Sequence, residues 1–303
     1  MQQIFLVFGG KIFRKRKNKN AQIRNASVRR NFLRKKKAFK ENLSILRMQK
    51  RKIIDLIVIG LLVVIGAALA FTLKTNLAIS TLFFYILPIV WLLFRGKFRY
   101  KKIIITTIVW GAIFGILDII SSVNGAWFIP ESQLILKTKL FAGVSIIEVL
   151  WFSILIFFIL LFYEHFIERE TAKISKRFKW AELILAITTI FIIALLSSGI
   201  FDKIKYVYLI IWGAYFIPPI LYILLFRPSL IKKFVLVMIP FFFINLLYEL
   251  SSVYAGHWSF PGEYIGQVTL FGIAFAFEEF LFWIILASTA MLAYYELFSD
   301  DMK

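Results

Sequence analysis

Five carboxylic acid side chains stand inside apolar stretches of this sequence: Asp118, Glu148, Glu249, Glu278 and Glu279. A charged side chain near the centre of a bilayer costs roughly 2.5–3.5 kcal/mol even on the most lenient scale. We therefore expect these groups to face the interior of a helix bundle. Burial and a second nearby acid both favour the neutral form of a carboxylic acid. A buried neutral acid is chemically a proton donor, and its ionised partner is a proton acceptor.

These acids belong to two copies of one pattern, an acid followed by Gly-x-Trp-x-x-Pro and then by a second acid. Each position of the first copy lies 131 residues before its counterpart in the second. The matched pairs are Asp118 and Glu249, Gly125 and Gly256, Trp127 and Trp258, Pro130 and Pro261, and Glu148 and Glu279. A constant offset over so long a stretch indicates an internal duplication.

The composition indicates a polytopic membrane protein. Hydrophobic residues make up 60% of the 303 residues, and the mean hydropathy is +0.81. Apolar runs of about twenty residues are typical of membrane helices. The chain has no cysteine, which excludes disulfides, iron–sulfur clusters and thiolate metal sites. Eight apolar segments are predicted as helices, at residues 53–73, 77–94, 103–122, 140–163, 181–200, 206–226, 233–254 and 267–296.

The positive charge gathers in loops and in an N-terminal tail. The net charge is +20, and residues 1–52 hold eighteen of the 37 Lys and Arg residues. A basic segment beside a membrane helix is typical of contact with anionic lipid headgroups, so no nucleic-acid partner is expected. With the N-terminus inside, one side of the membrane receives 32 basic residues and the other receives five. The positive-inside rule then predicts a multi-pass protein of the cell membrane with both termini in the cytoplasm.

The duplication and the segment count together predict the architecture. We expect an all-α membrane protein with a basic tail at 1–52, flexible or on the membrane surface, and two four-helix repeats at 53–170 and 171–303. An even number of helices per repeat gives both repeats the same orientation. The oligomeric state stays open.

Aromatic side chains accompany the acids. Trp151, Phe152, Phe282 and Trp283 follow Glu148 or Glu279 by three or four residues, so they share a helix face with them. Trp127 and Trp258 lie in the two loops. Aromatic rings beside a proton donor stabilise a developing carbocation by cation–π attraction. His257, in the second loop, is expected to be solvated.

The sequence lacks the motifs of several other kinds of chemistry. It contains no glycine-rich nucleotide motif, no His/Glu pair at zinc spacing and no Gly-x-Ser-x-Gly elbow. The segment Asn245-Leu-Leu-Tyr-Glu249 is only loosely similar to the Asp-rich magnesium motifs of membrane prenyltransferases. No metal or cofactor is therefore expected.

The pattern resembles the carotenoid-type lycopene cyclase domain, a membrane family found as two subunits or as a fused tandem. The resemblance rests on Asp118, Gly125-Ala-Trp127 and Ile146-Ile-Glu148-Val-Leu-Trp-Phe152, and on their counterparts Glu249, Gly256-His-Trp258 and Phe277-Glu278-Glu279-Phe-Leu-Phe282. The family's motif proline is replaced by Ser145 and Ala276, and one acid of its Glu-Glu pair by Ile147.

The resemblance implies a cofactor-independent isomerase that cyclises the end groups of an acyclic polyene such as lycopene. Glu148, Glu278 and Glu279 would be the acid and base groups, with Asp118 and Glu249 in support. Two alternatives stay open. Parallel repeats with intramembrane acids also occur in transporters and proton-coupled channels, and a membrane prenyltransferase-like enzyme would need a magnesium motif.

Overall fold

The computed structural model describes residues 49–96, 98, 100–134, 145–167 and 205–297, without the side chains of 147–149. The chain divides into two compact units, residues 1–54 and 55–303. The first unit contributes only the start of a helix, Gln49–Leu73, to the described residues. The second unit contains the loops, the pocket and the hairpin described for this protein. The predicted basic tail falls almost wholly outside the described residues.

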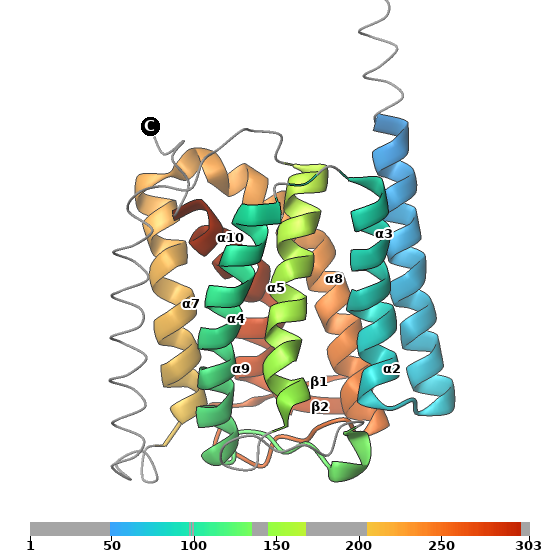
Figure 1. Cartoon of the computed structure of the whole chain (residues 1–303). Coiled ribbons are helices and arrows are strands. Elements are labelled where there is room, and N and C mark those ends of the chain that lie inside the picture. The colour runs from blue at the N-terminus through green and yellow to red at the C-terminus, as the bar shows by residue number, and fades with distance from the viewer. Residues whose placement is uncertain (1–48, 97, 99, 135–144, 168–204, 298–303) are drawn as a thin grey trace, which may run out of the picture. The chain divides into compact units, whose positions relative to one another are not determined.

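The second unit is mostly helical, and its helices are long and apolar (Figure 1). Within the described residues, six helices have the length and composition to cross a membrane, and Leu150–Phe166 in α5 adds a shorter apolar stretch. After Gln49–Leu73 the helical elements are α2 Leu77–Thr81, η1 Leu82–Ile86, α3 Leu87–Arg95, α4 Tyr100–Val123, η2 Glu131–Gln133, α5 Ile146–Phe166, α7 Val207–Phe226, η5 Pro228–Leu230, α8 Ile231–Ala255, α9 Phe277–Glu279, η6 Phe280–Leu286 and α10 Ala287–Leu297. The predicted helix at 181–200 lies outside the described residues, so the total of eight stays a prediction.

One predicted helix is wrong over its first ten residues. Residues 267–276 form an antiparallel hairpin, β1 Gln267–Leu270 and β2 Ile273–Ala276, with Leu270 paired to Ile273. The turn residues Phe271 and Gly272 have φ of 53° and 79°, as a two-residue hairpin turn requires. The prediction merged this stretch with the following helix because it relied on mean hydropathy. A mean hydropathy does not distinguish the two-residue period of a strand from the 3.6-residue period of a helix.

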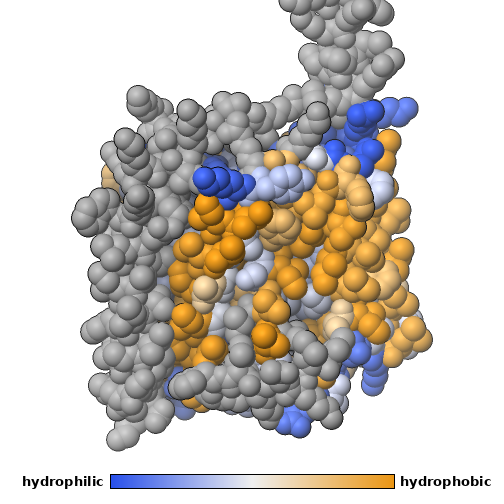
Figure 2. All heavy atoms as spheres, in the orientation of Figure 1, coloured by the Kyte–Doolittle hydropathy of each residue, from blue (hydrophilic) through white to orange (hydrophobic). Residues whose placement is uncertain are grey.

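The outer surface of the helices is apolar. Figure 2 shows a broad hydrophobic band between hydrophilic residues at the two ends of the unit. Large apolar side chains point outward along these helices, including Ile108, Leu225 and Phe243, each more than half exposed. Such a surface is stable in lipid and not in water. The chain is therefore a membrane-embedded protein.

The centre of the unit is formed by α5. Nearly every side chain from Leu155 to Tyr163 is buried, which is typical of a helix surrounded by others. In Figure 1 this helix runs beside α4, and α10 packs against it.

Three pairs of residues that are 131 positions apart touch each other. Phe128 and Ser259 exchange two backbone hydrogen bonds of 2.9 and 3.0 Å at the end of the unit that carries the loops. The rings of Phe152 and Trp283 lie 5.0 Å apart. Near the opposite end, the Tyr295 hydroxyl donates to Glu164. The first contact joins the two loops, and the other two join α5 to the helical segment 277–297.

Candidate functional site

Two loops with the same backbone geometry close the site, one after α4 and one after α8. Gly125 and Gly256 have φ of 70° and 74°, the left-handed conformation that glycine adopts without strain. The amides of Gly125 and Ala126 bond to the carbonyls of Ser122 and Ser121 at 2.9 Å each. The Gly256 and His257 amides make the matching bonds to Val253 and Ser252, at 3.1 and 2.9 Å. This is the Schellman end of a helix, formed twice.

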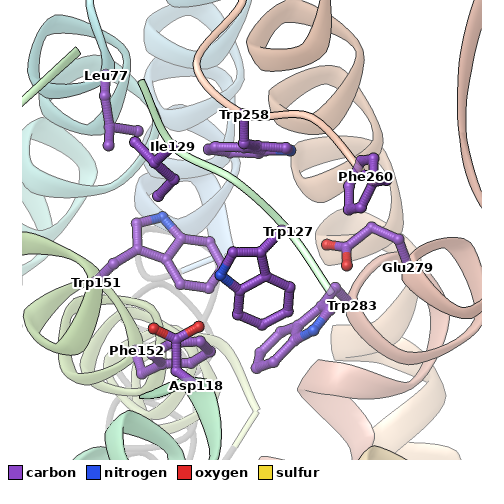
Figure 3. A pocket seen from close by; sticks show the side chains of 10 residues that line it. All are labelled: Leu77, Asp118, Trp127, Ile129, Trp151, Phe152, Trp258, Phe260, Glu279 and Trp283. Carbon is purple, nitrogen blue, oxygen red and sulfur yellow. The ribbon is translucent and has the colours of Figure 1, made fainter. Parts of the chain in front are cut away.

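Below these loops lies an apolar pocket of about 520 Å³, counted with its open mouth (Figure 3). Its wall is almost wholly aromatic and aliphatic, with two carboxyl groups in it. The lining residues are Leu77, Asp118, Trp127, Ile129, Trp151, Phe152, Trp258, Phe260, Glu279 and Trp283. In Figure 3 the Trp127 ring lies between Asp118 and Glu279. An apolar cavity with a few convergent polar groups is the usual form of a small-molecule site.

Glu279 is held by a tyrosine. It lies at the start of the helix 277–297 and is 7% exposed. Its carboxyl oxygen Oε2 accepts a hydrogen bond from the buried Tyr208 hydroxyl. The Trp127 ring packs edge-on against Tyr208 at 5.2 Å. The carboxyl group is thus fixed in direction by Tyr208 while it borders the pocket.

The helix after Glu279 has π-helical turns, η6. Such turns replace the bond from residue i+4 by one from i+5, and they are frequent at functional sites. Here the Trp283 carbonyl accepts a 2.8 Å bond from the Asn245 side-chain amide on α8. This contact fixes the helix where Trp283 enters the pocket wall.

Asp118 is the second carboxyl group of the pocket. It lies on α4 close to the helix end, is 2% exposed, and lines the pocket opposite the helix that carries Glu279. Two acids from separate elements, Asp118 and Glu279, therefore border one apolar space.

Of the other three predicted acids, Glu249 and Glu278 are described and do not line the pocket. Glu249 is buried behind the pocket wall, where the Trp258 indole N–H donates to its Oε1 at 2.9 Å. Glu278 is buried too, and its Oε1 accepts from the Ile265 amide at 2.7 Å, which ties the start of the helix to the segment before the hairpin. Glu148 lies in the first turn of α5, and its side chain is outside the described residues.

Five of the six predicted aromatic residues line the pocket: Trp127, Trp151, Phe152, Trp258 and Trp283. The sixth, Phe282, packs in the core against Tyr208 and Phe216. The Trp151 indole N–H donates to the Tyr248 hydroxyl at 3.0 Å, and that hydroxyl also lies 3.2 Å from Thr81 Oγ1. With its polar edge bonded elsewhere, the Trp151 ring presents an apolar surface to the pocket.

His257 is not solvated as predicted. It is fully buried, and its Nε2–H donates to the Thr75 carbonyl at 2.6 Å. Burial lowers the pKa of the imidazole below its ordinary value, and the bond to Thr75 opposes that shift only in part. The neutral ring thus joins the second loop to the segment before α2.

Sequence reasoning missed Tyr208, Leu77, Ile129 and Phe260. The last two lie inside the two tryptophan loops, 131 residues apart, so the repeated pattern could have identified them. Tyr208 stands 131 residues after Leu77, so the same offset relates the two residues beside the pocket. Nothing in a single tyrosine at a helix start marks it as the partner of a glutamate.

Acid–base chemistry is what this arrangement can perform. Within the described part of the chain, no group of three or more His, Cys, Asp or Glu residues could hold a metal ion. The pocket itself offers two carboxyl groups and aromatic faces. One carboxyl group can donate a proton, the other can accept one, and the rings can stabilise a cation between them.

The chemistry of the pocket must be inferred from its own residues, because comparisons of the chain with protein-family models, with curated proteins and with solved structures find no match.

Proposed function

We propose that this protein is a membrane-embedded isomerase that cyclises the end groups of an acyclic polyene of the lycopene type by acid–base chemistry. One observation carries the proposal: Asp118 and Glu279, from two separate helices, line a single pocket walled by tryptophan and phenylalanine rings. An apolar substrate fits such a wall, and among the described side chains Asp118 and Glu279 are the acids that line it.

In the proposed reaction, neutral Glu279 protonates the terminal carbon–carbon double bond of the substrate and leaves a tertiary carbocation. The next double bond attacks this cation and closes a six-membered ring. Asp118, as a carboxylate, then removes a proton beside the new cation and restores a double bond. One proton enters the hydrocarbon and one leaves, so no redox cofactor is consumed. The rings around the pocket stabilise the cation at each stage.

Tyr208 orients the carboxyl group of Glu279. Its hydroxyl donates to Oε2, which leaves the other carboxyl oxygen to carry the proton toward the pocket. The equivalent position in the first half is Leu77, which lines the pocket with a hydrocarbon side chain.

We also propose that the chain is a tandem duplication of four-helix units, with eight membrane helices and both termini in the cytoplasm. Contacts between residues 131 apart support it. Equivalent residues of two related units meet only close to a twofold axis. Phe128–Ser259, Phe152–Trp283 and Glu164–Tyr295 meet in this way at three levels. The pocket then lies on the axis, between the halves.

Expression in cells that accumulate lycopene, followed by pigment chromatography, tests the function. New cyclic carotenoids are expected from the intact chain and none from Glu279→Gln. Glu263→Gln is a matched control, because this glutamate is 60% exposed and lies outside the pocket. Intact protein that is folded in the membrane and yields no cyclic product would overturn the proposal.

A further inference from the structure

The β1–β2 hairpin has features that the proposed reaction does not use. Its tip residue, Phe271, is 92% exposed and has a positive φ of 53°. Asn, Asp and Gly are favoured at this position of a two-residue turn, and a bulky residue is strained there. The phenylalanine therefore gains nothing from the turn and nothing from packing within the described residues. Contact of this side chain with an apolar surrounding would explain why a phenylalanine stands at the tip.

The hairpin has two unlike faces. Val268, Leu270 and Phe275 pack in an apolar cluster with Leu246 and Leu250 of α8. Gln267 and Thr269, which alternate with them, are exposed. Because α8 is apolar enough to cross a membrane, this packing places the hairpin beside the last turns of a membrane span. A free strand edge is not tolerated deep in hydrocarbon, so the hairpin belongs at the membrane boundary.

Neighbouring residues have the composition of such a boundary. Tyr254, on the last turn of α8, is 46% exposed, and the Lys74 ammonium group lies 5.6 Å from the centre of its ring. Ile265, just before the hairpin, is 52% exposed. Tyrosine and lysine are enriched where the hydrocarbon of a membrane meets the headgroups.

We propose that the hairpin is a lipid-contacting element, with Phe271 inserted among the acyl chains at the headgroup boundary of the adjacent leaflet. Gln267 and Thr269 face the aqueous side. The hairpin runs directly into the helix that starts at Phe277, whose amide bonds to the Gly266 carbonyl at 3.0 Å. Lipid contact at the tip therefore anchors the segment that carries Glu279.

The absence of native cysteines makes the test direct. The full-length variants Phe271→Cys and Thr269→Cys are labelled with the fluorophore NBD and reconstituted in vesicles of phosphatidylcholine and phosphatidylglycerol. At position 271 we expect blue-shifted emission, quenching by lipids with a nitroxide high on the acyl chain, and protection from iodide. At position 269 we expect emission without a blue shift, little quenching by the lipid nitroxide and strong quenching by iodide. This position is the control for the face of the hairpin that contacts water.

Equal iodide quenching at both positions would overturn the proposal. Protection of position 271 from iodide and from the lipid nitroxide alike would also overturn it, because a protein partner or a second copy would then cover the tip. If the label disturbs folding, the unlabelled cysteines are compared in native membranes by their rate of reaction with a membrane-impermeant maleimide. The proposal requires a several-fold slower reaction at 271. None of these readouts depends on catalytic activity.

Discussion

The two halves of the unit share their loops and differ at the pocket. Both loops begin with a left-handed glycine and the same pair of backbone hydrogen bonds. At the pocket, the second half has Tyr208 bound to Glu279, and the first half has Leu77 at the position equivalent to Tyr208. Under the proposed duplication, the backbone has stayed alike at the two turns, while the side chains that could do chemistry have diverged. Substitutions at matched positions of the two halves test this difference.

The largest effect concerns the acids. Glu279→Gln and Asp118→Asn should each lower cyclisation by roughly a thousandfold, because an acid or base group contributes about 10²–10⁴-fold to a rate. Glu249→Gln, behind the wall, should keep more activity, since its contact is the Trp258 indole. Rates are measured by pigment chromatography in membranes with equal amounts of folded protein. Equal losses at positions 118 and 249 would mean that the halves are not functionally distinct.

The next effect concerns the tyrosine. Tyr208→Phe removes the hydroxyl that fixes Glu279 and should lower the rate about tenfold, in keeping with loss of a net interaction of about 1–1.5 kcal/mol. Tyr208→Leu copies the first half and should lower it further. The readout is the infrared carboxyl band of Glu279, identified by its loss in Glu279→Gln. Because the proposed bond is to this carboxyl group, an unchanged band in Tyr208→Phe contradicts the contact even where activity falls.

The loops should respond alike. A Cβ atom at Gly125 or Gly256 would meet no atom within 4 Å, so alanine there costs only the left-handed backbone conformation. That cost is about 1–2 kcal/mol per residue. Thermal unfolding of the detergent-solubilised protein should therefore show similar losses for Gly125→Ala and Gly256→Ala. A clearly larger loss of thermal stability in one variant would show that the two loops share a backbone geometry but differ in packing.

The smallest effect concerns pH, and of the two loops only the second should contribute to it. Because the pKa of folded His257 is below its ordinary value of 6.5, the unfolded state binds the proton more tightly. The histidine therefore leaves stability unaffected above pH 6.5 and lowers it as the pH falls below that value. His257→Gln should reduce this fall in the unfolding midpoint between neutral and mildly acidic pH. The first loop has Ala126 at this position and contributes no such dependence.

The sequence indicated most residues of the pocket wall, but not which of two adjacent acids borders it. A constant offset identified both tryptophan loops, and helical spacing placed Trp151, Phe152 and Trp283 beside the acids. It could not separate Glu278 from Glu279. Adjacent residues of a helix point about 100° apart, so only one of the two reaches the pocket, and the backbone decides which.

Two further features depended on contacts between distant segments. Tyr208 and Glu279 are 71 residues apart, and neither residue type predicts the other. The hairpin at 267–276 was hidden because its apolar composition equals that of a membrane helix. Phe271 is also not a residue type that usually forms a two-residue turn. Gly272 was therefore the only turn-forming residue between the two strands.

The Glu164–Tyr295 contact has a consequence for the history of the chain. Under the proposed duplication, a symmetric dimer of single repeats would place identical residues opposite each other on the axis. Two glutamates would repel each other there. Once the repeats are joined in one chain, equivalent positions can carry different residues. A hydroxyl in one copy can then contact a carboxylate in the other. A single gene can thus specify an unlike pair at the centre of a nearly symmetric protein, and separate identical subunits cannot.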